Sequence, residues 1–150
     1  MKFIEILSNE KEYIEQIIKI EERIFGKNGG VDYWILKPII RYGKVLAIEE
    51  NNKILAVAEL INNWDNNTIY IYGFCVDIKY QSKGIGKVFL EKLKEYIIKN
   101  KKTIKNIVLT VDKENIKAIK LYEKLGFEIE KELKDEYGKG IDRLYMMFKI

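Results

Sequence analysis

The chain contains no histidine, and this absence excludes a large share of enzyme chemistry. Without an imidazole, the chain cannot form a Ser-His-Asp or Cys-His catalytic arrangement, and it lacks the commonest ligand of zinc sites. Any general acid or base must be a carboxylate, a tyrosine, a lysine or water. We therefore expect no metal centre.

Cysteine and long apolar runs are equally scarce. The single cysteine, Cys75, excludes an internal disulfide and fits a reducing compartment. No apolar run approaches the ~20 residues that a membrane span needs. A charged helical pattern follows residues 1–6 directly, so no signal-peptide stretch is expected. These features predict a cytoplasmic protein without membrane association.

The charge balance is mildly basic. The chain has 27 Lys and Arg residues against 23 Asp and Glu, a net charge of +4, spread along its whole length. This pattern favours a solvated, lysine-rich surface over a nucleic-acid-binding patch. At 150 residues, 47% of them hydrophobic, the sequence predicts one domain spanning 1–150.

Hydrophobic periodicity predicts an alternating order of strands and helices. Apolar residues at helical spacing follow Asn9, and Asn9 and Glu12 have the spacing of a capping box. Asn51 and Asn52 suit a tight hairpin between two strands. Strands are predicted at 1–6, 44–50, 53–62, 68–76, 106–111, 127–133 and 142–149. Helices are predicted at 9–26, from the turn at 81–86 to 100, and at 112–125. A further short helix is predicted to end at about residue 41, with Pro38 at its start or at a kink. The fold class is therefore mixed α/β (α+β), with a mostly antiparallel central sheet of about seven strands, about four flanking helices and one strand-helix-strand crossover.

A glycine-containing turn, residues 81–86, leads from a strand into a helix. Such a turn exposes backbone N–H groups at the positive end of the helix dipole, which suits an anion. Phe89 stands where a dinucleotide-binding motif needs a third glycine, and Val88 stands where a P-loop needs Ser or Thr. Taken alone, the turn could also be an ordinary strand-to-helix connection.

Two linked motifs nevertheless give the turn a more specific interpretation. The first is Gln81-x-x-Gly84-x-Gly86. The second is Asn115, followed by the A-x-x-L-Y-x-K-L-G-F pattern at 118–127. They resemble, respectively, the pyrophosphate turn and the second signature of the GCN5-related N-acetyltransferase (GNAT) family. The resemblance covers about residues 44–127 and implies the GNAT fold, with acetyl-CoA as cosubstrate and no metal.

The resemblance also implies which residues bind the coenzyme. The strand before the turn pairs with pantetheine through its backbone, the turn holds the pyrophosphate, and the helix of the second signature contacts the pantetheine arm and the phosphates. In this chain the implied cofactor-binding residues are Phe74, Cys75, Val76, Gln81, Ser82, Lys83, Gly84, Ile85, Gly86, Lys87, Asn115, Ala118, Tyr122 and Lys124.

Tyr122 matches the family tyrosine that protonates the departing thiolate, a role that suits a phenol because it is normally protonated at neutral pH. The alternative is a core tyrosine on the apolar stripe of its helix. The resemblance also implies that the amide of Val76 faces the thioester oxygen, where it would stabilise developing charge.

The general base is less clear. Some family members carry a glutamate in an L-E-V run, but this chain has Leu109-Thr110-Val111. Glu59, on an apolar strand, is the best substitute, because apolar neighbours would raise its pKa and let it act through water. The alternatives are an acid at the solvated end of the sheet and, more weakly, Asp77 as the base. With no histidine to activate it, Cys75 is expected to be a buried core residue.

The predicted function is N-acetyl transfer from acetyl-CoA to a primary amine of a small molecule or peptide, by direct attack in a ternary complex. The alternative is a non-catalytic acyl-CoA-binding sensor. The resemblance implies an acceptor groove built from residues 26–41 and 135–140, and a possible homodimer. Its candidate wall residues are Tyr33, Trp34, Trp64, Tyr137 and Asp142.

Overall fold

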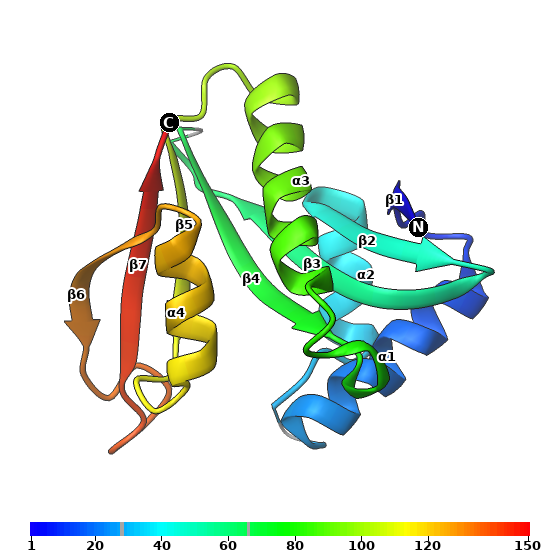
Figure 1. Cartoon of the computed structure of the whole chain (residues 1–150), viewed down its shortest axis with the longest axis horizontal. Coiled ribbons are helices and arrows are strands. Elements are labelled where there is room, and N and C mark those ends of the chain that lie inside the picture. The colour runs from blue at the N-terminus through cyan, green and yellow to red at the C-terminus, as the bar shows by residue number, and fades with distance from the viewer. Residues whose placement is uncertain (28, 66) are drawn as a thin grey trace. The chain divides into compact units, whose positions relative to one another are not determined.

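A computed structural model describes residues 1–27, 29–65 and 67–150 (Figure 1). The described residues form seven strands, four α-helices and one short 3-10 helix. In chain order they are β1 (Lys2–Glu5), α1 (Lys11–Phe25), α2 (Tyr33–Tyr42), β2 (Lys44–Glu50), β3 (Lys53–Asn62), β4 (Thr68–Val76), η1 (Ile78–Tyr80), α3 (Ile85–Asn100), β5 (Asn106–Val111), α4 (Ile116–Lys124), β6 (Glu128–Leu133) and β7 (Arg143–Lys149).

The strands follow the order β1-β2-β3-β4-β5-β7-β6. β4 and β5 run parallel, whereas β1–β2, β2–β3, β5–β7 and β6–β7 are antiparallel. The parallel pair needs a crossover, which α3 supplies. The predicted fold class, a mixed and mostly antiparallel sheet with four helices, is confirmed.

The β2–β3 hairpin turns at Asn51 and Asn52, as the sequence predicts. Their φ angles are 52° and 61°, so both residues adopt the left-handed conformation that a tight hairpin requires. Asparagine tolerates this conformation better than most residues.

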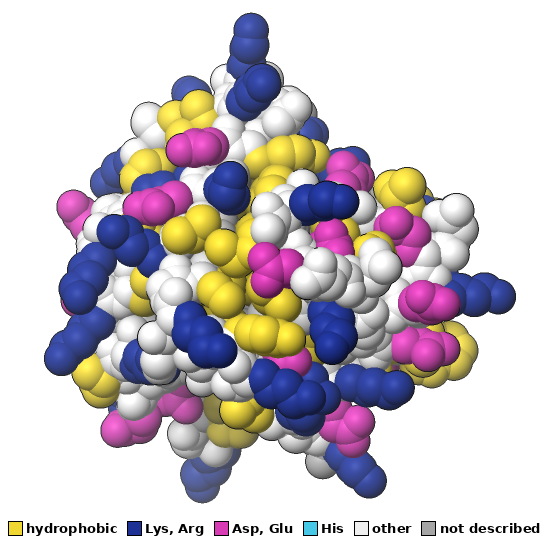
Figure 2. Space-filling model, turned by 45° about the vertical axis from the view of Figure 1, so that its right-hand side comes forward, with side chains coloured by type: hydrophobic (Ala, Val, Ile, Leu, Met, Phe, Trp, Pro, Cys, Tyr) yellow, Lys and Arg dark blue, Asp and Glu magenta, His cyan; other side chains and the backbone are white. Residues whose placement is uncertain are grey.

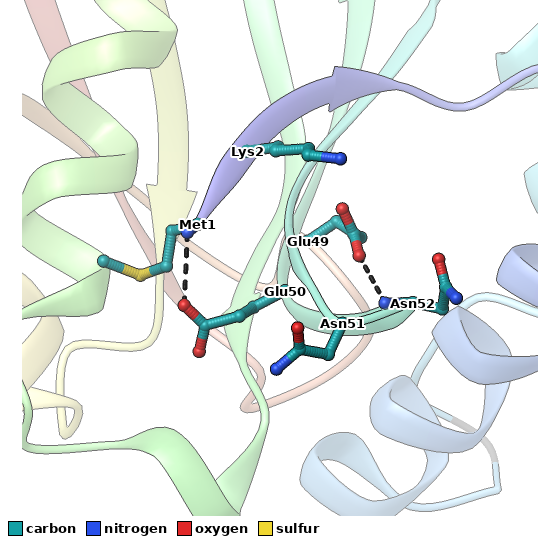
Figure 3. A pocket seen from close by; sticks show the side chains of 6 residues that line it. All are labelled: Met1, Lys2, Glu49, Glu50, Asn51 and Asn52. Carbon is teal, nitrogen blue, oxygen red and sulfur yellow. Dashed lines mark hydrogen bonds and ion pairs between the residues drawn. The ribbon is translucent and has the colours of Figure 1, made fainter.

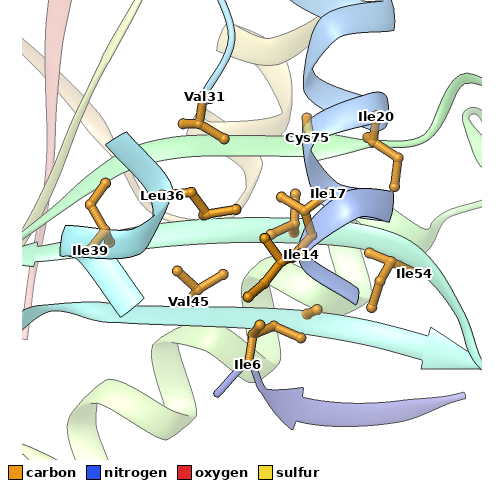
Figure 4. Packing of buried hydrophobic residues seen from close by; sticks show 12 residues of the cluster. Ile6, Ile14, Ile17, Ile20, Val31, Leu36, Ile39, Val45, Ile54 and Cys75 are labelled. Atoms are coloured by element: carbon orange, nitrogen blue, oxygen red, sulfur yellow. The ribbon is translucent and has the colours of Figure 1, made fainter. Parts of the chain in front are cut away.

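The chain divides into two compact units. The first comprises residues 1–61 and 72–93, and the second comprises residues 62–71 and 94–150. The first unit has a packed apolar core in which α1 and α2 face strands β2, β3 and β4 (Figure 4). Ile17, Leu36 and Val45 are completely buried there.

The second unit contains the parallel pairing of residues 68–71 with β5, and β7 pairs with β5 along all six residues from Asn106 to Val111. Ile107 and Met146 are fully buried, and the Phe127 and Phe148 rings pack with centroids 5.7 Å apart. This packing holds β5, β7 and the end of α4 together.

Several predicted helix details are wrong. α1 begins at Lys11 rather than Asn9, and the predicted capping box is absent, because Glu10 is the N-cap and makes no side-chain capping bond. Pro38 does not start α2: Asp32 caps that helix by accepting a hydrogen bond from the Ile35 amide, and Pro38 lies inside.

α4 also starts later than predicted, at Ile116. On α3, Val88 is 39% exposed and Leu90 is buried. In the described part of the chain, no helix is long and apolar enough to cross a bilayer.

Candidate functional site

Residues 81–84 of the turn are exposed, Ile85 is buried and Gly86 is half-buried. The short helix η1 separates the turn from the end of β4. The Gln81 side chain donates a hydrogen bond from Nε2 to the carbonyl of Val76, at 3.0 Å. The short helix η1 precedes it and is capped by Asp77, which accepts from the Lys79 amide at 3.2 Å. Side-chain bonds therefore fix the turn to the last residue of β4.

Two residues of this turn have positive φ angles, Ser82 at 61° and Gly84 at 78°. A Cβ placed on Gly84 would meet no atom within 4 Å, so open space surrounds this backbone. α3 begins at the next residue, and the first amides of a helix have no intrahelical acceptor. The turn therefore presents backbone donors to an open, exposed space, which fits an anionic group such as a diphosphate.

Two lysines flank this turn. The Lys83 ammonium lies 5.5 Å from the centroid of the Tyr80 ring, and Lys87 lies 3.9 Å from Glu91, one turn further along α3. Both lysines are exposed. Elsewhere the charges are mixed: on the face shown in Figure 2, Lys and Arg side chains are interspersed with Asp and Glu side chains.

The second half of β4 has one face on α3 and the other on α1. The Phe74 ring stacks on Phe89 of α3, with centroids 5.3 Å apart. Cys75 faces the other way, and its thiol donates to Oε1 of Glu21 on α1 at 3.0 Å. Burial is the largest of the effects that raise the pKa of Cys75 well above its usual value. The prediction that Cys75 is buried is confirmed, because only 5% of its surface is exposed.

Glu59 is the most unusual residue in this unit. It lies on β3 with 0% of its surface exposed, and neither carboxylate oxygen has a hydrogen-bond partner among the described residues. Its carboxylate occupies the space beside Gly73 that a side chain would otherwise fill. The alternative that Glu59 lies at the solvated end of the sheet is therefore wrong. Burial, reinforced by the negative charge of Glu21, raises the pKa of Glu59 well above its ordinary value.

The other predicted site residues lie in the second unit, on α4. Asn115 is the N-cap of this helix, and its Oδ1 accepts a hydrogen bond from the Ala118 amide at 3.2 Å. Ala118 is half-buried and Lys124 is exposed. Asn115 therefore has a structural role that the sequence pattern did not predict, besides the role in coenzyme binding that the resemblance implies.

A helix-ending motif fixes Tyr122. The Phe127 amide donates to the carbonyl of Tyr122, and the Gly126 amide to the carbonyl of Glu123, both at 3.0 Å. With Gly126 at φ 89°, these two bonds form a Schellman motif. The rings of Tyr122 and Phe127 pack 5.9 Å apart, and Tyr122 is 7% exposed.

Sequence reasoning missed a polar cluster on β4, β5 and β7. The Tyr70 hydroxyl lies 3.4 Å from that of Thr110 and 3.5 Å from that of Tyr137. Arg143 donates to the Thr110 carbonyl at 3.1 Å, and its guanidinium lies 5.6 Å from the Tyr137 ring centroid. Burial raises the pKa of Tyr70 to about 12. The sequence offered one signal: Thr110 replaces the glutamate of the L-E-V run.

The candidate acceptor-wall residues are mostly exposed. Trp34 is 87% exposed, Trp64 fully so, and Tyr33 and Tyr137 about half. Asp142 differs, because its carboxylate accepts from the Lys113 ammonium at 3.1 Å and from the Asp135 amide at 2.9 Å. These bonds lower the pKa of Asp142 and tie the 135–140 loop to the start of β7.

Two of the cavities that the described residues form lie in the first unit. The larger, about 430 Å³, is lined by Met1, Lys2, Glu49, Glu50, Asn51 and Asn52. Figure 3 shows that the terminal amine points toward Glu50 and that the Glu49 carboxylate points toward the Asn52 amide. None of these is a predicted site residue. The smaller, about 210 Å³, is lined by Ile18, Glu22, Gly26, Lys27, Gly30, Val31 and Asp32. Across the described residues, no three Cys, Asp or Glu side chains are placed to hold a metal ion.

Comparisons with known proteins agree with one another. A model of the acetyltransferase (GNAT) family matches residues 14–127. An N-alpha-acetyltransferase of Saccharolobus solfataricus is 30% identical over 145 residues, which cover 89% of this chain and 85% of that protein. A spermine/spermidine N(1)-acetyltransferase of Bacillus subtilis is 33% identical over 92 residues, or 61% of this chain and 52% of that protein. The chain thus spans about half the length of the Bacillus subtilis relatives that it matches.

A solved structure has the same fold. Arabidopsis thaliana Naa50, in complex with the bisubstrate analogue CoA-Ac-MVNAL, superposes with a TM-score of 0.80 over all of both chains. Its sequence identity of 19% means that this likeness shows the fold alone.

Proposed function

We propose that this chain, which belongs to the acetyltransferase (GNAT) family, transfers the acetyl group of acetyl-CoA to a primary amine of a small molecule or peptide. The observation that carries the proposal is the turn at 81–86, which the Gln81 side chain bonds to the end of β4 and which has open space beside Gly84. Backbone donors at the start of α3 suit the diphosphate of the coenzyme.

The residues of the first unit would bind the coenzyme. The turn residues Gln81, Ser82, Gly84, Ile85 and Gly86 supply backbone donors, and Lys83 and Lys87 add positive charge. The backbone of Phe74, Cys75 and Val76 would pair with the pantetheine as an added strand does. The Val76 amide would then stabilise negative charge on the thioester oxygen.

The residues of the second unit would assist coenzyme binding and catalysis. Asn115, Ala118 and Lys124 would contact the coenzyme, and Tyr122 would give its phenolic proton to the departing thiolate. The Schellman motif supports this role, because it fixes the backbone from which Tyr122 projects.

The amine must lose a proton, and Glu59 is the proposed acceptor, through an intervening water. Its buried carboxyl has a raised pKa, which is what a base working near neutrality needs. Cys75 is not proposed as a nucleophile, since its pKa is also raised and its thiol donates to a carboxylate. Direct attack by the amine on the thioester is the remaining route.

The acceptor is proposed only as a class. Relatives of this chain are named for polyamine and N-alpha acetylation, and both chemistries use an amine. A screen of polyamines, amino acids and peptides by mass spectrometry, each with acetyl-CoA, would identify the acceptor.

Tyr122→Phe tests the catalytic assignment. Removing the phenolic proton should slow acetyl transfer tenfold or more, while calorimetry should find the affinity for CoA unchanged. The matched control is Tyr96→Phe on α3, which should leave both quantities as they are. If Tyr122→Phe transfers acetyl at the rate of the unmodified protein, Tyr122 is not the acid. If no amine in the screen is acetylated although CoA binds, the transferase proposal is wrong.

A further inference from the structure

Two buried carboxylates lie next to Gly73 of strand β4. A Cβ built on Gly73 would have as its nearest neighbours Oε2 of Glu59 and, at 4.0 Å, Oε1 of Glu21. The two side chains come from β3 and α1 respectively and are 0% and 2% exposed. Glycine at position 73 makes this arrangement possible, because any side chain there would occupy the space that holds the Glu59 carboxylate.

The two carboxylates have different partners. Glu21 accepts a hydrogen bond from the Cys75 thiol at 3.0 Å and from the Val31 amide at 3.4 Å. Glu59 accepts none from the described residues. Donors stabilise a charged carboxylate, and a buried carboxylate without donors favours its protonated form. The geometry therefore assigns the negative charge to Glu21 and the proton to Glu59.

We propose that Glu21 and Glu59 form a dyad that shares one proton, in which Glu59 relays the proton taken from the acceptor amine and Glu21 receives it. This inference rests on the proposed transferase function. Glu21 would contact no substrate; it is a positioning residue that acts through Glu59.

The proton balance of the relay is simple. The amine N–H proton passes through water to one oxygen of Glu59, and the proton already on Glu59 passes to Glu21. Glu21 changes from carboxylate to carboxylic acid, while Glu59 ends in the state in which it began. One negative charge is lost from the dyad, and one proton is gained by it.

One hydrogen-bond donor to Glu21 lines a cavity of the first unit. The Val31 amide that donates to Glu21 belongs to the loop before α2, and Val31 also lines the cavity of about 210 Å³. Figure 4 shows Val31 and Cys75 in the same packed group of side chains. Release of the proton from Glu21 into this cavity would return the dyad to its starting state.

The groups packed around the dyad include one ion pair and several neutral side chains. Asp77, after β4, is 6% exposed and adds negative charge nearby, although Arg23 of α1 pairs with it at 2.8 Å. Cys75 on β4 is neutral, and the buried residues of α2 are Leu36 and Ile39, which are apolar. Burial raises the pKa of both Glu21 and Glu59, and the negative charge of Glu21 raises that of Glu59 further.

A titration without substrate tests the dyad directly. In protein labelled with carbon-13 at glutamate Cδ, the Glu59 signal, identified by its loss in Glu59→Gln, should show a protonated carboxyl at pH 7. Glu21→Gln removes the neighbouring charge, so the midpoint for Glu59 should fall by about one pH unit or more. The matched control is Glu15→Gln, an exposed site on the same helix, which should leave the midpoint unchanged. A Glu59 that is ionised at pH 7, or whose midpoint Glu21→Gln does not move, overturns the proposal.

A second measurement needs no variant at position 59. Cys75 is the only cysteine, so the infrared S–H stretching band reports on the thiol that donates to Glu21. Protonation of Glu21 weakens this hydrogen bond, so the band should shift to higher frequency as the pH falls, at a midpoint above that of an ordinary glutamate. In Glu21→Gln the band should not respond to pH. A band in the unmodified protein that stays constant through this range contradicts the charge assigned to Glu21.

Kinetics separate this inference from the proposed function. In the pH profile of kcat/KM, the fall at acidic pH should have the same midpoint as the shift of the S–H band. Glu21→Gln should move this midpoint to lower pH. If the titrations succeed but no amine is acetylated, the dyad exists and the transferase proposal fails. If acetylation proceeds but its acid limb is the same in Glu21→Gln, the relay is wrong.

Discussion

At the scale of single residues, the chain places an acid at a fully buried position of β3. Glu59 is surrounded on β3 by buried Ala and Leu residues, and each buried polar group without a partner costs about 1–3 kcal/mol. Gly73 is matched to Glu59, since its missing side chain provides the space.

This burial should make the stability depend on pH. The pKa of Glu59 is raised in the folded state, so the folded protein binds the proton more tightly than the unfolded chain. The associated stability is complete below the unfolded-state pKa and is lost as the pH rises through the folded-state pKa. Glu59→Gln cannot titrate. Its free energy of unfolding should therefore rise relative to the unmodified protein, by at most about 1.4 kcal/mol per pH unit in this window.

Urea unfolding at a series of pH values from 4 to 9 measures this difference. Glu95→Gln, at an exposed position of α3, is the control for removing a negative charge at the surface. The difference in free energy of unfolding between Glu59→Gln and the unmodified protein should therefore change with pH. If this difference stays constant, Glu59 has the same pKa in the folded and unfolded chains.

At the scale of elements, strands were easier to predict than helix ends. The bounds of β2, β3, β4 and β5 are those predicted, because β-branched runs and hairpin asparagines define them. Helix starts depend on which of several nearby polar residues caps the first turn. Asp112 and Asn115 are equally good caps by type, and only the structure shows that Asn115 accepts from Ala118.

The residues of the candidate site also differ in how well the sequence predicts them. The turn at 81–86 and Tyr122 follow from motifs with fixed spacing. Glu21 could not be predicted, because it stands in the charged run Glu21-Glu22-Arg23 and only the packing of α1 against β4 shows which of the three is buried. The Tyr70 cluster was missed because strand pairing and a distant loop assemble it.

The end of α4 offers a prediction for one element. Gly126 has φ 89°, and a Cβ there would lie 3.1 Å from the Phe148 ring. Gly126→Ala should therefore cost about 1–2 kcal/mol for the left-handed backbone, plus the displacement of Phe148. Gly140→Ala is the matched control, since Gly140 has φ 79° and open space around it.

Thermal unfolding compares the two variants. Gly126→Ala should lower Tm more than Gly140→Ala, and acetyl transfer should fall with it because the motif fixes Tyr122. Equal losses of Tm would show that Phe148 moves aside freely and that the contact has no energetic weight.

At the scale of the whole molecule, β4 and α3 are each divided near their middle by the boundary between the compact units. Residues 68–71 of β4 belong to the second unit and residues 72–76 to the first, and α3 divides between Leu93 and Lys94. Breaking a strand or a helix in its middle removes hydrogen bonds on both sides of the break. We therefore propose that residues 1–150 unfold as one domain, as expected for a chain of this size.

Native-state hydrogen exchange tests this proposal, because it measures the opening free energy of each segment. The slowest amides of β2 and β3 in the first unit, and of β5 and β7 in the second, should open with one common free energy. Ile71→Ala, at a position of β4 that is 3% exposed, should lower that value in both units equally, by about 2–5 kcal/mol. Ile129→Ala, at a position of β6 that is 46% exposed, should change it little. If Ile71→Ala speeds exchange in β5 and β7 while β2 and β3 keep their protection, the units unfold separately, and β4 does not couple them.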